Sequence, residues 1–231
     1  MKIGSSLFQQ LMGSYVEPVI MDYCKSCDGT AFFSSFGDLP VDPYFPKEIS
    51  GRRRRRFGSF AVSDEGNEIT PLPHSPFFQS LKLNSVAGGI QRNFSPLDPT
   101  VRDSSVLHSL LRLLVMQLDE PQVSWEVNVH QVRSEATGGP TLPAPEGIHR
   151  DGHDFLAIVG INRLGIVGGE NRVFDERKKL ILETTLLEPF DLILIDDRRT
   201  YHSVSPIHSP SQQIGYRDIF ILDFNRVSAG L

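Results

Sequence analysis

Two histidines and one aspartate in this chain offer a complete set of metal ligands. His149 and Asp151 stand two residues apart, and His202 follows later in the sequence. In an extended segment, side-chain alternation places His149 and Asp151 on the same side and turns Arg150 away. Two imidazoles and one carboxylate form the ligand set that holds non-heme Fe(II) and leaves half of its octahedron open. The spacing therefore favours a metal centre that can bind further ligands.

The histidine-aspartate pair is weak evidence by itself, because a short pattern arises readily by chance in a chain with seven histidines. A surface histidine beside an ordinary aspartate would explain the pair, and a strand end would explain His202. Two apolar runs, residues 155–161 and 192–195, separate the pair from His202 and predict strands. Pairing of those strands would carry His202 back across a barrel to the other two ligands.

The composition indicates one enzyme-sized domain. The chain has 231 residues and a formal net charge of -5, and a chain of this length can bury about 70% of its unfolded surface. The acidic balance argues against general attraction to nucleic acid or to an anionic membrane. No stretch has the length of a membrane span, and residues 1–20 contain Gln9, Gln10 and Glu17 where a secretion signal needs an apolar run. Cytoplasm is the expected location.

The cysteine pair and the arginine run invite functional interpretations that the rest of the sequence does not support. Cys24 and Cys27 form a C-x-x-C pair, but no second pair completes a zinc site, so two reduced cysteines are expected. The run Arg52–Arg56 stands in an acidic chain without a second basic cluster, and residues 56–60 resemble the start of a strand. We expect a solvated edge with one or two arginines turned inward, where one could meet a substrate carboxylate.

The chain divides into three stretches of one domain. Residues 1–100 are rich in Pro, Gly and Phe, and their turn signals predict a region that wraps or lids the core. Residues 101–119 contain the clearest helix, since leucines and valines recur at helical spacing and Asp103, Ser104 and Ser105 offer a cap. Residues 120–231 alternate apolar and polar positions in several short runs separated by turns, as in residues 126–133, 180–186 and 219–224. That pattern predicts a β-sandwich or barrel.

Several segments resemble the Fe(II)/2-oxoglutarate-dependent dioxygenases, namely residues 147–155, 168–170, 201–204 and 216–218. Residues 54–57 and 87–94 resemble, more narrowly, the branch that contains bacterial L-isoleucine hydroxylase, whose members oxidise free amino acids. The resemblance spans about residues 52–225. It implies a mainly β fold with flanking helices around a double-stranded β-helix, or jelly-roll and cupin-like, core.

The resemblance also implies roles for particular residues. His149, Asp151 and His202 would bind Fe(II), while 2-oxoglutarate and O2 would take the open positions as co-substrates. Arg217 matches the family's position for the 5-carboxylate of 2-oxoglutarate, and a guanidinium suits a bidentate contact with a carboxylate. A surface ion pair with Asp218 is the alternative for Arg217. Co-substrate contacts are also expected from two residues on or near the predicted inner face of the strand at 126–133, namely Asn128 and Gln131.

Substrate contacts follow from the charges of a free amino acid, which presents a carboxylate and an ammonium group. The site should therefore offer cationic donors for one group and a carboxylate for the other. His153 is the nearest such residue to the metal pair, where it could equally make a supporting hydrogen bond. The available candidates also include Gln131 and Arg92. The predicted substrate residues are His153, Asp154, Arg133 and Glu170.

Three functional hypotheses of different classes follow. The first is a hydroxylase that acts on an aliphatic C–H bond of a free L-amino acid resembling isoleucine, leucine or methionine, with 2-oxoglutarate and O2 converted to succinate and CO2. The second is a cupin-like metal-binding sensor or isomerase that does not use 2-oxoglutarate. The third is a binding module for RNA built on the arginine run. The first predicts a small-molecule partner and no binding to nucleic acid or membrane.

Overall fold

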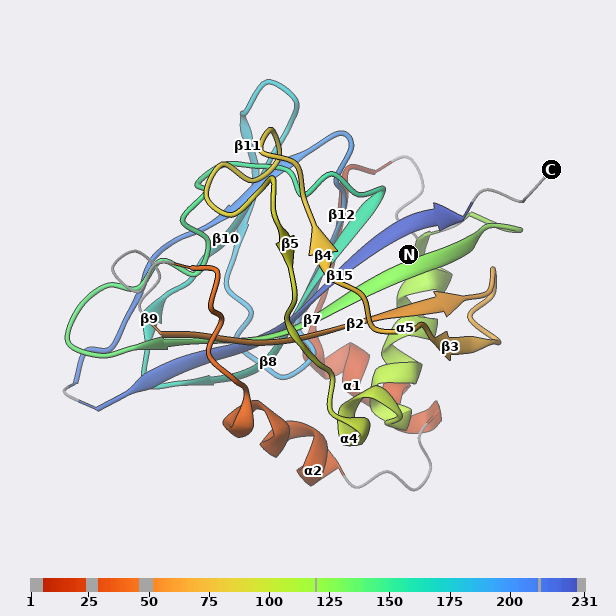
Figure 1. Ribbon diagram of the computed structural model, residues 1–231, viewed down its shortest axis with the longest axis horizontal. Coiled ribbons are helices and arrows are strands. Elements are labelled where there is room, and N and C mark those ends of the chain that lie inside the picture. Colours follow the sequence, from red (N-terminus) through yellow and green to blue (C-terminus); the bar gives the residue numbers. More distant parts are fainter. Residues whose placement is uncertain (1–5, 24–28, 46–51, 119, 212, 228–231) are drawn as a thin grey trace.

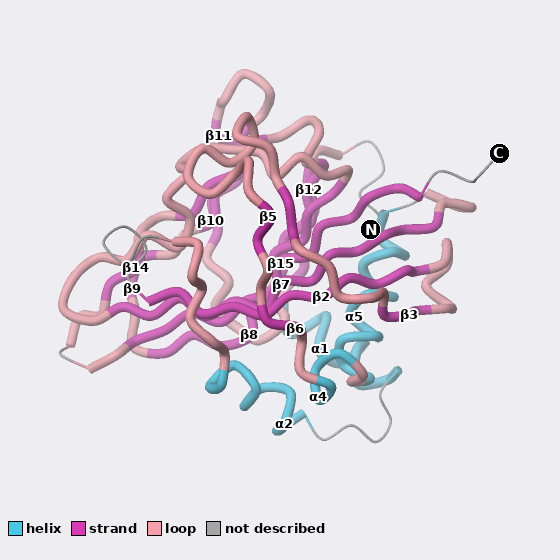
Figure 2. Tube along the Cα trace, viewed as in Figure 1, coloured by secondary structure: helices cyan, strands magenta, loops and turns pink. Residues whose placement is uncertain are grey.

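The computed structural model describes residues 6–23, 29–45, 52–118, 120–211 and 213–227, and they form a mainly β protein with helices on one side (Figure 1; Figure 2). Cys24 and Cys27 lie outside the described residues. No helix in the described ranges is long and apolar enough to cross a membrane. The helices are α1 (Gly13–Tyr23), α2 (Gly29–Ser34), the 3-10 helix η1 (Ser35–Asp38), α4 (Pro99–Arg102) and α5 (Ser105–Leu118).

One large sheet carries most of the strands. Its order is β1-β12-β8-β15-β7-β2-β3, with β6 beside β2. The two longest strands, β7 and β15, pair over their whole length, with Asp223 opposite Asn128 and Arg217 opposite Ser134. The strands of this sheet are β1 (Phe8–Leu11), β2 (Arg52–Val62), β3 (Ile69–Pro71), β6 (Ser95–Pro96), β7 (Ser124–Ala136), β8 (Phe155–Leu164), β12 (Leu192–Asp196) and β15 (Gly215–Val227).

A smaller sheet faces the large one and closes the jelly roll. Its order is β11-β10-β13, and the segment at His149 extends it by an isolated antiparallel bridge to His202. The predicted jelly-roll core is therefore confirmed. The remaining strands are β4 (Phe77–Phe78), β5 (Gln91–Arg92), β9 (Val167–Gly168), β10 (Asn171–Phe174), β11 (Leu180–Thr184), β13 (Tyr201–Val204) and β14 (Ile207–His208).

Strand alternation divides the hydrophobic residues between two cores. On β15, Phe220 and Leu222 pack toward the helices with Leu110 of α5, whereas Ile219 and Ile221 face the space between the sheets. Figure 1 shows α1, α2, α4 and α5 together on one side of the long strands. The helices thus cover the outer face of the large sheet and leave its inner face to the pocket.

The predicted helix in residues 101–119 is present but begins later. It starts at Ser105, and the Ser104 hydroxyl accepts a hydrogen bond from the amide of Leu107 (3.1 Å) as an N-terminal cap. The preceding turn forms the separate short helix α4, which Pro99 can begin because proline lacks an amide hydrogen.

The first hundred residues do more than wrap the core. β2 is an eleven-residue strand inside the large sheet, paired with β7 on one side and with β3 and β6 on the other. β1 adds another strand beside β12. The sequence indicated only the start of a strand at residues 56–60 and did not indicate β1. The arginines before residue 56 lack the apolar alternation that marks a half-buried strand.

Candidate metal centre and its pocket

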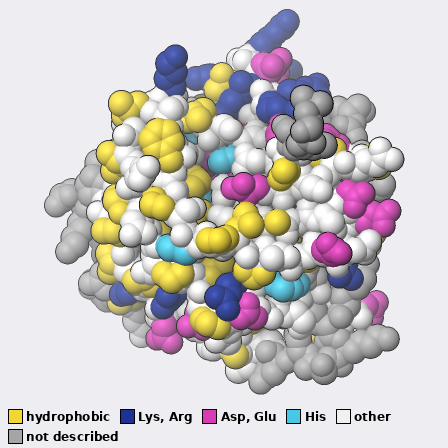
Figure 3. Space-filling view, turned by 45° about the vertical axis from the view of Figure 1, so that its right-hand side comes forward, with side chains coloured by type: hydrophobic (Ala, Val, Ile, Leu, Met, Phe, Trp, Pro, Cys, Tyr) yellow, Lys and Arg dark blue, Asp and Glu magenta, His cyan; other side chains and the backbone are white. Residues whose placement is uncertain are grey.

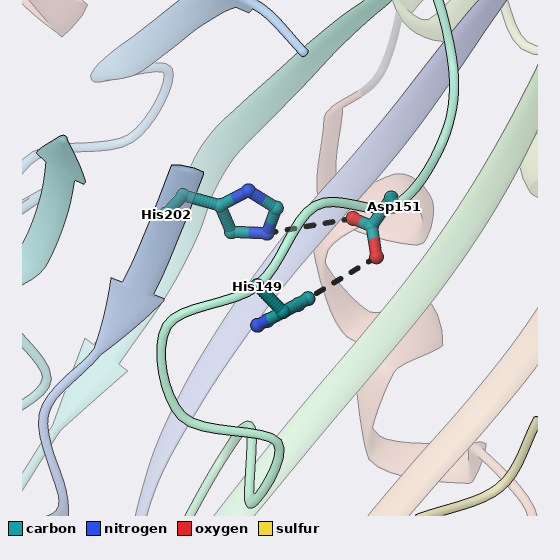
Figure 4. A group of neighbouring side chains, drawn as sticks. All are labelled: His149, Asp151 and His202. Atoms are coloured by element: carbon teal, nitrogen blue, oxygen red, sulfur yellow. Dashed lines mark ion pairs between the residues drawn. The ribbon is translucent and has the colours of Figure 1, made fainter. Parts of the chain in front are cut away.

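The three predicted metal ligands converge at one point between the sheets (Figure 4). One ligand atom from each of His149, Asp151 and His202 lies within 4.8 Å of the others. The Nε2 atom of His149 lies 3.6 Å from Asp151 Oδ1, and the Nε2 atom of His202 lies 3.4 Å from Asp151 Oδ2. Two imidazole nitrogens and a carboxylate facing one point fit Fe(II), which such a set binds on one face of its octahedron.

Backbone pairing holds the two histidines side by side. The amide of His149 donates to the carbonyl of His202 (3.0 Å), and the amide of His202 donates to the carbonyl of His149 (2.9 Å). The Nδ1 atom of His149 lies 2.9 Å from the carbonyl of Gly147, which can only accept, so Nδ1 carries the proton. Nε2 is therefore the nitrogen of His149 that could bind a metal ion. This bridge brings His202 beside His149 and Asp151, as the sequence predicted.

Asp197 organises the loop that carries Asp151. Its carboxylate accepts hydrogen bonds from the amides of Gly152 (2.7 Å) and His153 (3.0 Å), and it lies 3.7 Å from Nδ1 of His202. Carboxylates behind metal-binding histidines fix the orientation of the ring and raise its basicity. Asp197 is therefore placed to support two ligands from one position.

The charges of the three ligands are strongly linked. Burial opposes ionisation of Asp151, but hydrogen bonds from His149 and His202 hold its pKa well below the usual range. Burial likewise opposes protonation of His149, yet the hydrogen bond to Asp151 raises its pKa to about 9. A metal ion bound by these residues would take the place of that proton as the positive partner of Asp151.

Gln79 connects the metal ligands to a buried arginine. Its amide nitrogen donates to Asp151 Oδ1 (3.1 Å), and its amide oxygen accepts from Nη2 of Arg92 and from Asn84 (3.3 Å). Asn84 in turn donates to Glu146 (3.0 Å). This hydrogen-bonded chain helps to fix the orientation of the Asp151 carboxylate.

Arg217 lies in the same pocket without a counter-ion. Its side chain is 4% exposed, and Nη2 donates to Oδ1 of Asn171 (2.9 Å). No carboxylate in the described part of the chain pairs with it, and the predicted alternative fails because Asp218 pairs with Arg133 instead (2.6 Å). Burial, followed by the nearby charge of Arg163, lowers the pKa of Arg217 to about 10. A buried cation of this kind favours an anionic ligand.

Two further arginines and a histidine line the other part of the pocket. Arg55 and Arg92 are buried between aromatic rings, and Nη2 of Arg55 donates to Nδ1 of His130. The Nε2 atom of His130 lies 3.0 Å from Asp223. Burial and then the charge of Arg55 lower the pKa of His130 well below its usual value, so the ring is neutral and donates from Nε2 to Asp223.

The inward arginines come from the predicted arginine run. Arg53 and Arg55 line the pocket, whereas Arg54 pairs with Glu135 (2.9 Å) and Arg56 donates to the carbonyl of Pro96 (3.0 Å). The prediction of one or two inward arginines agrees with this arrangement. The predicted solvated edge is wrong, because β2 has neighbours on both sides.

The two further residues predicted to contact the co-substrate, and Arg150, lie outside the pocket lining. Asn128 points inward, but its Oδ1 atom accepts a hydrogen bond from the hydroxyl of Ser59 (2.8 Å). Gln131 was placed on the wrong face: it alternates with the inward residues of β7 and donates to Ser35 of η1 (2.8 Å). Arg150 points away as predicted, donating to the carbonyl of Thr200 (2.7 Å) with its guanidinium over the ring of Tyr201.

The four predicted substrate residues also lie outside the pocket lining. Arg133 is paired with Asp218, Asp154 is paired with Arg226, and Glu170 accepts from Ser205. His153 stays close to the site, where Nδ1 contacts Asn225 (2.8 Å) and Nε2 lies 3.3 Å from Asp223. His153 therefore supports Asp223 instead of facing the pocket.

Several residues of the pocket carry no recognisable signal in the sequence. Gln79 and Asn84 lie in loops with no periodic pattern, so nothing in the sequence marked them. Asp223 could have been recognised, since it lies on the same face of a predicted strand as Ile219 and Ile221. The residues that line the pocket without a predicted role include Gln79, Asn84, Glu146, Asn171 and Asp223.

The fold and the site define a jelly-roll protein with a two-histidine, one-carboxylate metal centre in an arginine-lined pocket. Residues 34–223 match the family model of the 2OG-Fe dioxygenases, and the chain belongs to this family. The protein is thus an oxidoreductase whose family uses Fe(II), 2-oxoglutarate and O2.

The chain is similar to a curated enzyme and to solved structures. It is 23% identical to L-isoleucine-4-hydroxylase from Bacillus thuringiensis over 157 residues, which cover 64% of this chain and 65% of that enzyme's length. A bsmA homolog from Methylobium petroleophilum PM1 superposes with a TM-score of 0.79 and 28% identity, covering 96% of this chain and 90% of the other. IDO from Bacillus thuringiensis gives a TM-score of 0.73 at 15% identity, covering 97% and 92%.

Proposed function

We propose that this protein hydroxylates an aliphatic C–H bond of a free L-amino acid, with 2-oxoglutarate and O2 converted to succinate and CO2. His149, Asp151 and His202 are the proposed iron ligands, and Arg217 is the proposed partner of the 5-carboxylate of 2-oxoglutarate. The observation that carries the proposal is the buried, unpaired guanidinium of Arg217 in the same pocket as the ligand triad. The amino-acid substrate rests on the similarity to L-isoleucine-4-hydroxylase.

Bound Fe(II) would supply the redox chemistry that activates O2. The protein's own groups position the reactants and exclude water. Arg217 and Asn171 fix one end of the co-substrate, and Ile158, Ile219 and Ile221 give the space between the sheets an apolar wall. In such a dry site a carboxylate-guanidinium contact is strong and geometrically defined.

The co-substrate step is tested by adding 2-oxoglutarate to the anaerobic Fe(II) protein. We expect a new visible absorption band, because a keto acid that chelates iron changes its electronic spectrum. Arg217→Ala should weaken 2-oxoglutarate binding on the order of 100-fold, since a buried charge-paired contact is lost. Arg217→Lys should lose less, because it keeps the charge but not the fork. Metal binding without any spectral response would favour a barrel that acts without 2-oxoglutarate.

The substrate step is tested with Fe(II), ascorbate, 2-oxoglutarate and a panel of free L-amino acids that includes isoleucine, leucine and methionine. Succinate that accumulates only with particular amino acids supports the proposal. Turnover that requires a peptide, a nucleic acid or an unrelated small molecule would contradict the proposed substrate while leaving the family assignment intact.

A further inference from the structure

A second group of buried charges lines the pocket beside the metal ligands. Arg55 is 5% exposed, and Arg92 and Asp223 are each 1% exposed. Each side chain keeps one buried polar atom without a hydrogen-bond partner in the described part of the chain: Nε of Arg55, Nε of Arg92 and Oδ1 of Asp223. Buried polar atoms are rarely left unsatisfied, so three of them around one pocket indicate a polar ligand.

The two arginines form a cationic site with an aromatic frame. The guanidinium of Arg55 lies 4.3 Å from the ring centre of Phe94, and that of Arg92 lies 4.9 Å from the ring centre of Phe77. No described carboxylate forms an ion pair with either arginine. Two buried like charges repel one another, and their burial also costs desolvation free energy. An anion that contacts both would relieve the repulsion. Desolvation and the charge of Arg53 lower the pKa of Arg55 to about 9, in agreement with this unmet charge.

Asp223 supplies the opposite charge at a fixed position. Neutral His130 accepts from Arg55 at Nδ1 and donates to Oδ2 of Asp223 at Nε2 (3.0 Å), so one ring connects the cationic and anionic groups. The ring is itself held between Phe57 (4.7 Å between ring centres) and Phe77 (4.6 Å). The remaining oxygen, Oδ1, is left to accept from a ligand.

The other charged residues of the pocket already have partners or tasks. Arg53 pairs with Asp42 (3.5 Å) and donates to the carbonyl of Pro143. Glu146 accepts from Asn84 (3.0 Å). Arg217 lies at the opposite end of the inward face of β15 from Asp223, six residues away, which corresponds to roughly 20 Å of extended strand. Arg55, Arg92 and Asp223 are therefore available as a unit separate from the co-substrate arginine.

We infer that Arg55 and Arg92 bind the α-carboxylate of the substrate and that Asp223 binds its α-ammonium group. This inference rests on the proposed function and assigns the residues that recognise a free amino acid. An α-amino acid carries both charges on one carbon, which matches a cationic pair and a carboxylate joined through a single imidazole. The head group is then fixed beside the metal, because Gln79 links Arg92 to Asp151. With the head group fixed, the distance of each side-chain carbon from it determines which carbon lies at the metal and reacts.

The inference is tested first with ligands of the wild-type protein, loaded with Mn(II) and 2-oxoglutarate so that turnover does not interfere. Calorimetry would compare an amino acid that supports succinate formation with the carboxylic acid that lacks its amino group and with the amine that lacks its carboxylate. We expect each analogue to bind on the order of 100-fold more weakly, because each leaves one buried charge unpaired. An analogue that binds as tightly as the amino acid would overturn the assignment.

Variants then separate the roles of the three residues. Arg55→Gln and Arg92→Gln should raise the KM for the amino acid at least about 30-fold while changing the KM for 2-oxoglutarate less than threefold. Asp223→Asn should reduce the preference for the amino acid over its deaminated analogue. Arg56→Gln is the matched control, since this arginine of the same strand points to the other face. Lysine variants at positions 55 and 92 should recover part of the affinity, and melting curves of the metal-loaded proteins check their folding.

The two levels of failure are distinguishable. If amino acids are turned over and the variants at 55, 92 and 223 keep wild-type KM values, the head-group assignment is wrong and the proposed function stands. If the wild-type protein couples 2-oxoglutarate turnover only to compounds without a carboxylate and an amino group, both are wrong. Loss of affinity in Arg55→Gln and Arg92→Gln with an altered analogue preference in Asp223→Asn supports the assignment.

Discussion

Gln79 is an uncharged side chain that contacts both a metal ligand and a pocket arginine. Its amide nitrogen must face Asp151, because a carboxylate can only accept. Its amide oxygen must face Arg92, because a guanidinium can only donate. The orientation of the amide is therefore fixed by its partners. A glutamate at this position would place a negative charge against Asp151.

Replacing Gln79 should weaken metal binding without removing a ligand. In Gln79→Ala the Asp151 carboxylate loses one of the hydrogen bonds that orient it, and we expect the Kd for Mn(II) to rise on the order of 10-fold. Metal titration by calorimetry measures the change. Gln213→Ala, at an exposed position, is the control and should match the wild type. An unchanged Kd in Gln79→Ala would show that Asp197 alone is sufficient to orient the loop.

Asp223 should give the metal-free protein a characteristic pH dependence. Burial, reinforced by the charge of Asp151, raises the pKa of Asp223 to about 7. A carboxyl whose pKa is higher in the folded state binds its proton more tightly when folded. Its contribution to stability is therefore present below the unfolded pKa of about 3.9 and is lost as pH rises through about 7.

The measurement is the free energy of unfolding of the wild type and of Asp223→Asn in urea between pH 4.5 and 7.5. Relative to the variant, the wild type should lose on the order of 1 to 3 kcal/mol across this range, at about 1.4 kcal/mol for each pKa unit. A difference between the two proteins that stays constant with pH would contradict the raised pKa.

At the scale of elements, the turn between β9 and β10 positions the residue that holds Arg217. Gly168 and Gly169 both have positive φ angles, +82° and +77°. A Cβ atom at Gly168 would lie 2.0 Å from the carbonyl oxygen of Pro206. The chain can therefore pass here only as glycine, and Asn171, the partner of Arg217, begins the next strand.

Gly168→Ala should destabilise the fold and weaken 2-oxoglutarate binding together. We expect a loss of more than about 2 kcal/mol in unfolding free energy, since both a left-handed backbone and a steric clash oppose the change. Gly138→Ala is the matched control: its φ is +69°, but nothing lies within 4 Å of the added atom. It should cost about 1 kcal/mol and leave the KM for 2-oxoglutarate unchanged. Equal effects of the two substitutions would contradict the packing argument.

The elements that sequence analysis predicted are those with a clear period. The strands at β7, β8, β11, β12 and β15 and the helix α5 all follow apolar patterns that local propensity and burial both favour. β2 was not predicted as a member of the large sheet because arginines occupy its inward positions. Buried arginines are unusual in a strand, and the pocket that accommodates them is formed by residues distant in sequence. Gln131 was misassigned because both faces of β7 are buried, and alternation alone does not say which face meets the pocket.

Site residues could be predicted where the chemistry requires a particular residue type. They could not be predicted where their role depends on tertiary contacts. His149, Asp151 and His202 form a ligand set that few other residues could supply, and the structure brings them together. Arg133 and Asp154 were reasonable charged residues for a substrate, but each is neutralised by a partner distant in sequence, Asp218 and Arg226. Such pairings depend on the strand register and the packing of the loops, which one sequence does not reveal.

At the scale of the whole molecule, the charge of the pocket is opposite to that of the chain. The net charge is -5, yet four arginines and three carboxylates line the pocket. On the face drawn in Figure 3, histidine and acidic side chains lie at the centre among hydrophobic ones, while Lys and Arg gather at the top. The pocket therefore gathers arginine charge within an acidic protein, an arrangement that the folded state tolerates better once an anion is bound.

Ligands should accordingly stabilise the fold in separable increments. Each ligand at 100 times its Kd adds about 2.7 kcal/mol, or roughly 5 to 10 °C in Tm for a chain of this size. Thermal unfolding with Mn(II) alone and with Mn(II) plus 2-oxoglutarate should show two steps. Arg217→Ala should keep the metal increment and lose the second, whereas Arg56→Gln should keep both. A co-substrate increment that persists in Arg217→Ala would place the carboxylate elsewhere.

The arginine run of β2 cannot specify its own alignment in the sheet. A slip of one residue along β7 would replace most of these arginines by other arginines, so the charges at this end of the strand discriminate little between alignments. Alignment must be set by the residues that follow: Phe57 in its aromatic cluster, Gly58 against Leu97, and Phe60 in the core beneath the helices. Phe57→Ala should therefore shift the strand as well as leave a cavity. The positions of the pocket arginines are thus encoded by neighbours that carry no charge.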